Sequence, residues 1–131
     1  MKITLNLMYA MVTLYMASAC AGDVYVVTHP DTQVSVADIK EVFSGEKQFF
    51  GQLRAIPVDN SAVQTDFLVK VFKISLDRYN TMWTKKSFRD GIITPALKIN
   101  DAEVIAFIKS TPGAVGYISK PNTAVKIIEK Y

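Results

Sequence analysis

The sequence has very little of the chemistry that disulfide bonds and metal sites require. Of its 131 residues, one is a cysteine, Cys20, and one is a histidine, His29. A single cysteine excludes a disulfide bond within the chain, and one cysteine with one histidine cannot form a Cys/His metal cluster. We therefore expect neither a disulfide scaffold nor a metal centre.

Catalytic and cofactor motifs are also missing. The sequence contains no G-x-S-x-G nucleophile pattern and no G-x-x-x-x-G-K phosphate loop. His29 lies between an apolar run and Pro30 with no motif around it, which is more typical of a surface residue than of a general base. Ser61 has no paired histidine that would activate it as a nucleophile. The sequence therefore predicts no enzyme activity and no cofactor.

The charge of the chain is nearly balanced. Fifteen Lys and Arg residues stand against 12 Asp and Glu residues, a formal net charge of +3. The basic residues are spread along the sequence, and their local cluster of Lys85, Lys86 and Arg89 is typical of a solvated helix face. Because nucleic-acid binding requires basic residues concentrated on one face, we expect no nucleic-acid partner.

The first 21 residues have the pattern of a bacterial-type secretory signal segment. Lys2 is followed by a mostly apolar run at residues 3–16 and then by small residues up to Gly22. A positive start, a short apolar stretch and an A-x-A pattern are typical of such segments, whereas a membrane span needs ~20 predominantly apolar residues. We therefore expect a signal peptide at residues 1–21, one domain at residues 22–131, and a periplasmic or secreted product.

Two cleavage sites remain open. Cleavage after Ala19 would leave Cys20 at the new N-terminus, where a lipid on its thiol would attach the protein to a membrane. Cleavage after Ala21 would leave a soluble product without cysteine. The A-x-A pattern favours the soluble product, because lipoprotein signals usually carry a large aliphatic residue where this chain has Ala17. A membrane partner is expected only if Cys20 is lipidated.

From Asp23 onwards, strand and helix patterns alternate. Runs rich in β-branched and aromatic residues predict strands at residues 23–29, 55–58, 115–119 and 125–128. Helical spacing after a capping residue predicts helices that begin after Ser35, Asn60 or Ser61, Ser75, and Asn100. This order predicts an α/β fold with a mixed, mostly parallel sheet and helices packed on it.

Three details of this pattern carry structural expectations. Pro57 implies that its strand lies at an edge of the sheet or that the proline stands at a strand end. Residues 46–53, with Phe49 and Phe50, are predicted to form a loop. Tyr79 and Trp83 lie four residues apart in a helical pattern, which predicts that they pack in the core.

The strand-to-helix transition at Asp59-Asn60-Ser61 is the most suggestive local feature. A helix start offers free amide groups and the positive end of the helix dipole, so an anion could bind the amides of Ala62 and Val63 with the Ser61 hydroxyl. The alternative is that Asn60 or Ser61 simply caps the helix.

The sequence from Val104 to Ser119, which contains PGAVGY, resembles the ending PGAIGYV of phosphate-binding proteins of ABC transporters. The segment Val36–Glu46 resembles their L-x-x-I-F-x-G helix, and the order of elements is collinear over residues 24–119. The resemblance implies a type 2 periplasmic-binding-protein-like fold, here a single lobe, in a short phosphate ABC transporter substrate-binding-like protein.

The resemblance also implies a ligand site. The anion loop of the family falls on residues 58–65, where Ser61 matches cleanly and Asp59 approximately, while the Arg and the Ser-Gly-Thr run of the family are absent. The ligand-binding residues implied for a small oxyanion such as phosphate are Asp59, Asn60, Ser61, Ala62 and Thr65.

A second function fits the same fold. The chain is then a non-catalytic interaction module without a small-molecule ligand, which docks on another envelope protein or on a second copy of itself. An exposed apolar patch near Phe49, Phe50 or Trp83 would support this alternative.

Overall fold

The computed structural model describes residues 22–131. The predicted signal peptide, both cleavage sites and Cys20 lie outside the described residues. Among the described residues, no helix is both long and apolar enough to cross a membrane.

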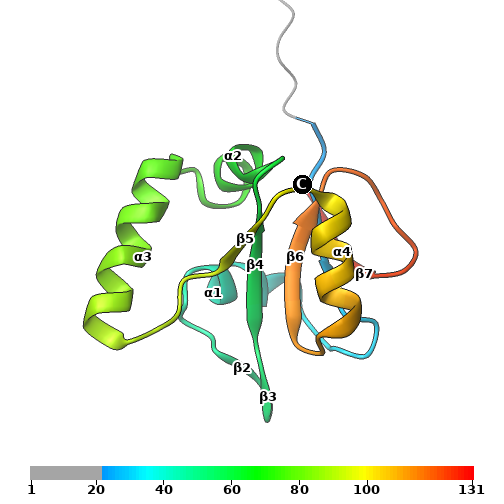
Figure 1. Cartoon of the computed structure of the whole chain (residues 1–131), viewed down its shortest axis with the longest axis horizontal. Coiled ribbons are helices and arrows are strands. Elements are labelled where there is room, and N and C mark those ends of the chain that lie inside the picture. The colour runs from blue at the N-terminus through cyan, green and yellow to red at the C-terminus, as the bar shows by residue number, and fades with distance from the viewer. Residues whose placement is uncertain (1–21) are drawn as a thin grey trace, which may run out of the picture.

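A five-stranded sheet in the order β5-β4-β6-β1-β7 forms the centre of the molecule (Figure 1). Its strands are β1 (Tyr25–Thr28), β4 (Ile56–Asn60), β5 (Ala96–Lys98), β6 (Ala114–Ile118) and β7 (Lys126–Lys130). Strand β4 is parallel to β5 and β6, whereas β1 is antiparallel to both β6 and β7. Four strands therefore run in one direction and β1 in the other, which confirms the predicted mixed, mostly parallel α/β fold.

Helices cover both faces of this sheet. They are α1 (Val36–Phe43), α2 (Gln64–Phe67), the π-helical turn η1 (Leu68–Phe72), α3 (Leu76–Asp90) and α4 (Asp101–Ser110). One core joins α1, α2, η1 and α3 to Val26 and Tyr117 of the sheet, and the other joins α4 to Val27 and Val58. The alternation of side chains along each strand supplies both cores, because successive residues point to opposite faces.

Several local predictions are confirmed. Ser35 and Asp38 form a capping box at the start of α1, and Ser75 and Asn100 cap α3 and α4 with their side chains. Tyr79 and Trp83 are both buried. The indole Nε1 of Trp83 donates a hydrogen bond to the carbonyl of Phe43 (3.2 Å), which satisfies its polar atom within the core.

One local prediction needs correction, and the prediction for Pro57 is met by its second alternative, a position at a strand end. The predicted loop contains a short hairpin, in which β2 (Phe49–Phe50) pairs with β3 (Leu53–Arg54) and projects from the body (Figure 1). Strand β4 is internal rather than at an edge, and Pro57 stands near its beginning, before β5 starts to pair at Val58. The absent proline N–H therefore costs no ladder hydrogen bond with β5.

Both glycines of the PGAVGY segment stand at positions where the structure leaves no room for a side chain. Gly113 has a φ of +87°, and a Cβ there would overlap the carbonyl oxygen of Arg54. A Cβ at Gly116 would lie 2.8 Å from Val104 Cγ1, so this glycine lets α4 pack closely on β6. The segment is therefore needed for the close approach of backbone and helix, whichever ligand the protein binds.

We expect Gly113→Ala to lower the free energy of unfolding by about 2 kcal/mol or more, because it adds a backbone clash to the strain of a positive φ. Gly51→Ala is the matched control, since Gly51 also has a positive φ (62°) but open space around it. Its loss should be about 1 kcal/mol. Urea unfolding of both variants measures the difference, and equal losses would contradict the role of the Arg54 contact.

Candidate functional site

The residues predicted to bind a ligand lie together where β4 ends, at the edge of the sheet to which the parallel strands β4, β5 and β6 all point. In open α/β sheets this edge is the usual place for ligands. Ser61, Ala62 and Thr65 are exposed there. Asp59 and Asn60, the last residues of β4, are 2% and 0% exposed, so they face the protein interior rather than a solute.

The carboxylate of Asp59 is held by two tyrosine hydroxyls. Tyr79 of α3 donates to one oxygen (2.8 Å) and Tyr117 of β6 donates to the other (2.9 Å). Burial raises the pKa of Asp59 to about 6, although both hydrogen bonds favour its charged form. Burial, and then the neighbouring carboxylate, also hold the pKa of both tyrosines well above the ordinary value, so they remain donors.

The side chain of Asn60 closes the end of the sheet. Its Nδ2 donates to Asp101 Oδ1 (2.8 Å) and to the carbonyl of Tyr117 (3.0 Å), and its Oδ1 accepts from the amide of Ala62 (3.0 Å). Asp101 also accepts hydrogen bonds from the amide (3.0 Å) and the hydroxyl (2.7 Å) of Ser119. Asn60 and Asp101 thus tie β4, β6 and the first turn of α4 together.

The turn after β4 differs from the predicted helix start. Helix α2 begins at Gln64, and neither Asn60 nor Ser61 caps it, because the N-cap residue is Val63 and no side chain bonds there. This prediction was wrong because the Asn60 side chain bonds to the turn and to its neighbours instead of the helix amides.

The amides of this turn are already in use. Ser61 donates to the carbonyl of Lys98 (2.8 Å) and Val63 to the carbonyl of Asn60 (3.2 Å). With Ala62 bonded to Asn60 Oδ1, the two amides proposed from the sequence as anion ligands both have acceptors within the protein. The amides of Gln64 and Thr65, in contrast, donate to no acceptor among residues 22–131.

The charges around the turn are mostly negative. Asp59 and Asp101 lie behind it, and Asp66 stands in the first turn of α2. Lys98, whose carbonyl accepts from the amide of Ser61, ends the neighbouring strand β5, and its ammonium lies 4.7 Å from the ring centroid of Phe107. An oxyanion at this turn would therefore face carboxylates without an arginine fork to neutralise it.

Sequence reasoning missed the role of Asp101. The residue follows the cap Asn100, where a negative charge is favourable at any helix N-terminus, so its position in the sequence indicates no further role. Its partners Asn60 and Ser119 lie 41 and 18 residues away, so no local spacing could indicate the network.

Comparisons with known proteins identify this fold. No protein-family model matches the sequence, and no curated protein matches it. Among solved structures, a protein described as a phosphate ABC transporter substrate-binding protein with bound phosphate, from Clostridium perfringens, superposes with a TM-score of 0.58 at 12% identity. An ABC-type phosphate transport receptor from Vibrio cholerae superposes with a TM-score of 0.51 at 13% identity.

Each comparison covers 83% of this chain, and the chain spans about half the length of the two structures, 46% and 47%. The described residues therefore have a periplasmic-binding-protein-like fold and correspond to one lobe of it. At this identity the likeness establishes the fold, while the ligand remains a matter for the site itself.

Asp59 generates a prediction for the pH dependence of stability. Its folded pKa is raised above the unfolded value, so its contribution is fully present below about pH 4 and is lost as the pH rises through about 6. One pKa unit corresponds to about 1.4 kcal/mol, so the stability of the wild type relative to Asp59→Asn should fall by about 2–3 kcal/mol between pH 4 and pH 7.

Urea unfolding at a series of pH values measures this difference. Asp77→Asn, which removes an exposed carboxylate in the first turn of α3, is the control for net charge. A wild-type minus Asp59→Asn difference that stays constant across this range would show that Asp59 does not titrate with a raised pKa.

Proposed function

We propose that this chain is an exported, non-catalytic, solute-binding-like protein of the cell envelope. The observation that carries the proposal is its fold, which it shares with about half of a protein that has bound phosphate. The pattern of residues 1–21 supports export through a signal peptide. The turn after β4 offers hydroxyls and amides to a ligand but no nucleophile paired with a base, which supports binding rather than catalysis.

The ligand that we propose for this turn is a small oxyanion such as phosphate. The groups that favour it are the exposed Ser61 and Thr65 residues and the amides of Gln64 and Thr65, which lack protein acceptors. The buried Asp59 and Asn60 would support the turn rather than touch the anion. Because carboxylates surround the turn and the fork of an arginine is absent from residues 58–65, we expect weak binding.

We expect phosphate to bind with a dissociation constant of about 1 mM. At 10 mM phosphate this would add about 1.4 kcal/mol of stability and raise the midpoint of thermal unfolding by a few degrees over an equal concentration of chloride. Ser61→Ala should remove most of the rise, whereas Thr81→Ala, an exposed control on α3, should keep it. No rise with phosphate or sulfate, or an equal rise in Ser61→Ala, would contradict binding at this turn.

The β2–β3 hairpin favours a second candidate function, docking on another envelope protein. Phe49 is 48% exposed and Leu53 is 37% exposed on a segment that projects from the body. Trp83 is buried and Phe50 half-buried, so Phe49 carries the exposed part of the patch expected from the sequence. Exposed apolar side chains on a projecting hairpin are typical of an interaction surface.

For this second function, we expect one envelope protein to be captured by the native chain and lost with the double variant Phe49→Ser, Leu53→Ser. Val36→Ser is the matched control, because Val36 is exposed to a similar extent (47%) at the start of α1. Affinity capture from an envelope extract, with light scattering to measure self-association, tests this. Equal capture by both variants would contradict docking through the hairpin.

A further inference from the structure

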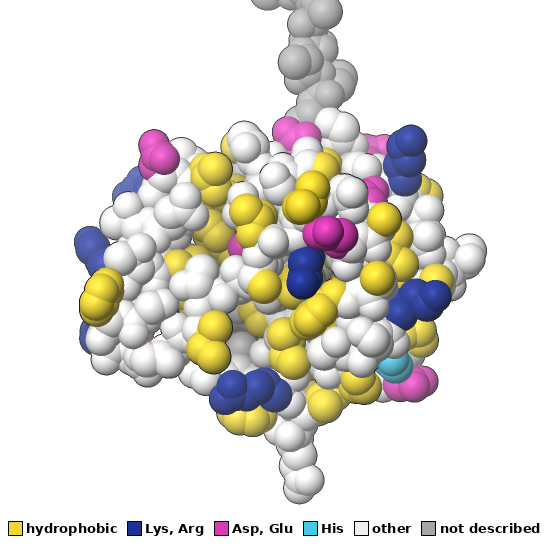
Figure 2. Space-filling model, viewed as in Figure 1, with side chains coloured by type: hydrophobic (Ala, Val, Ile, Leu, Met, Phe, Trp, Pro, Cys, Tyr) yellow, Lys and Arg dark blue, Asp and Glu magenta, His cyan; other side chains and the backbone are white. Residues whose placement is uncertain are grey.

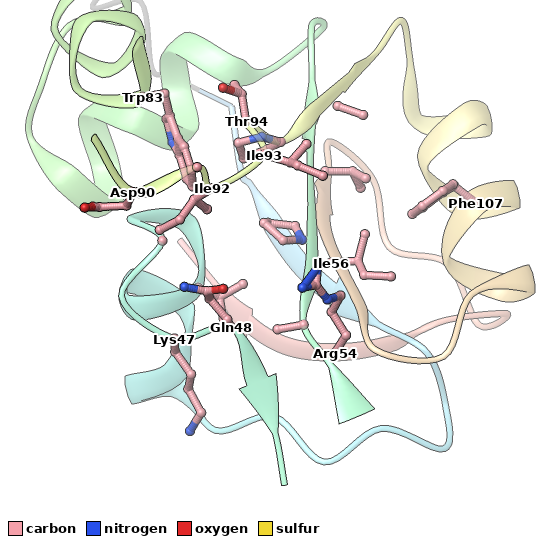
Figure 3. Close-up of a pocket in the computed structure, with 18 residues that line it drawn as sticks. Lys47, Gln48, Arg54, Ile56, Trp83, Asp90, Ile92, Ile93, Thr94 and Phe107 are labelled. Atoms are coloured by element: carbon pink, nitrogen blue, oxygen red, sulfur yellow. The ribbon is translucent and has the colours of Figure 1, made fainter. Parts of the chain in front are cut away.

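A cleft of about 480 Å³ lies at the opposite end of β4 from the Ser61 turn (Figure 3). Its walls come from the first residues of β4, the segment between α3 and β5, Arg54 of the hairpin and Phe107 of α4. Ile56 and Asn60 are separated by about 13 Å along the strand, so the two places are distinct. The volume is within the range of small-molecule pockets, about 300–1,000 Å³.

The pairing of the sheet explains why the cleft is open. Strand β5 pairs with β4 only from Val58 onwards, which leaves the edge of Ile56 and Pro57 without a neighbouring strand. Pro57 has no N–H to offer at this edge, so a strand that paired there would lose a hydrogen bond. The edge is therefore better suited to apolar contact than to the addition of another strand.

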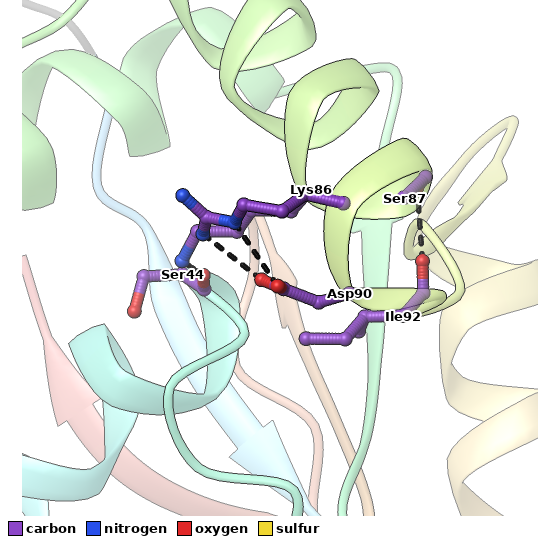
Figure 4. Close-up of polar contacts among 6 residues, drawn as sticks. Ser44, Lys86, Ser87, Asp90 and Ile92 are labelled. Atoms are coloured by element: carbon purple, nitrogen blue, oxygen red, sulfur yellow. Dashed lines mark hydrogen bonds and ion pairs between the residues drawn. The ribbon is translucent and has the colours of Figure 1, made fainter.

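Hydrogen bonds at the end of α3 fix the outer wall of the cleft to the helix (Figure 4). The hydroxyl of Ser87 donates to the carbonyl of Ile92 (2.9 Å) and lies 3.1 Å from the hydroxyl of Thr94. The ammonium of Lys86 donates to the carbonyl of Ser44, which fixes α3 to the end of α1. The cleft is thus bounded by segments that are tied to the body of the protein.

The lining is mainly apolar and carries one unneutralised charge. Hydrophobic side chains gather over β4 and β5, where the surface is hollowed (Figure 2). The guanidinium of Arg54 lies towards Ile56 in the cleft, whereas Lys47 points away (Figure 3). In the described part of the chain Arg54 forms no ion pair with an acidic residue, and its guanidinium carbon lies 5.6 Å from the ring centroid of Phe49.

The other charges of the lining have partners. Lys47 pairs with Asp38 (2.7 Å), and Asp90 accepts two hydrogen bonds from Arg89 (2.9 and 3.0 Å). The cleft therefore presents apolar walls and a single free cation. A guanidinium binds a carboxylate through two parallel hydrogen bonds, and apolar walls favour an apolar body attached to that carboxylate.

We propose that this cleft binds a free organic acid with one carboxylate and an apolar body. The carboxylate binds the guanidinium of Arg54, and the apolar body lies against Ile56, Ile92 and Phe107. This site is separate from the oxyanion turn, and its ligand differs from phosphate because it contributes apolar surface as well as charge.

The test is calorimetric titration of the mature protein with decanoate, decanol and inorganic phosphate. Decanoate should bind saturably at one site and change the fluorescence of Trp83, the one tryptophan of the sequence, which lines the cleft. Decanol should bind at least about tenfold more weakly, and phosphate should neither compete with decanoate nor change this fluorescence.

Two variants assign the site. Arg54→Gln should weaken decanoate binding at least about tenfold and leave decanol binding unchanged, whereas Lys130→Gln, which removes a cation that also lies over an aromatic ring (Tyr25, 5.8 Å), should have no effect. Circular dichroism confirms that each variant is folded. No saturable decanoate binding, or equal binding by the native protein and Arg54→Gln, would overturn the proposal. Neither result depends on whether phosphate binds at the Ser61 turn.

Discussion

The structure depends on a buried carboxylate that is shared by three elements. Asp59 ends the central strand β4 and receives hydroxyl hydrogen bonds from α3 and β6, so it fixes the distance of that helix from the sheet. Each tyrosine would leave a buried hydroxyl without a partner if the carboxylate were absent, and such a loss costs about 1–3 kcal/mol. A ligand that bound the Asp59 carboxylate would therefore have to displace one of these tyrosine hydroxyls.

The fold was predictable to a large extent because its signals are local. The capping box at Ser35, the caps at Ser75 and Asn100 and the apolar strands each act within a few residues, and all are present in the structure. The site was less predictable because its interactions are distant in sequence. Asparagine is a residue type that often caps helices, and Asn60 precedes a helix. Its side chain instead bonds to Asp101, which lies 41 residues away, and it does not cap α2.

The two ends of β4 differ in how their polar groups are satisfied. At the carboxyl end, Asn60, Asp101 and the turn amides bond to one another, so the strand terminus is closed by the protein itself. At the amino end, β5 has not yet begun and Pro57 has no N–H, so this edge presents no unpaired proline donor and only a carbonyl acceptor. At the edge where such sheets usually bind ligands, the polar groups are thus already hydrogen-bonded within the protein. The cleft lies at the opposite edge.

This difference also separates the two ligand chemistries. A small oxyanion must exchange its hydration shell for protein donors, and the Ser61 turn offers few donors and several carboxylates in return. An apolar acid at the other end keeps part of its carboxylate hydration, since Arg54 is exposed, and gains from the apolar area removed from water, at about 25 cal/mol per Å². Of the two ends of β4, the amino end therefore offers a ligand more apolar area and a free guanidinium, whereas the carboxyl end offers polar groups that are mostly bonded within the protein.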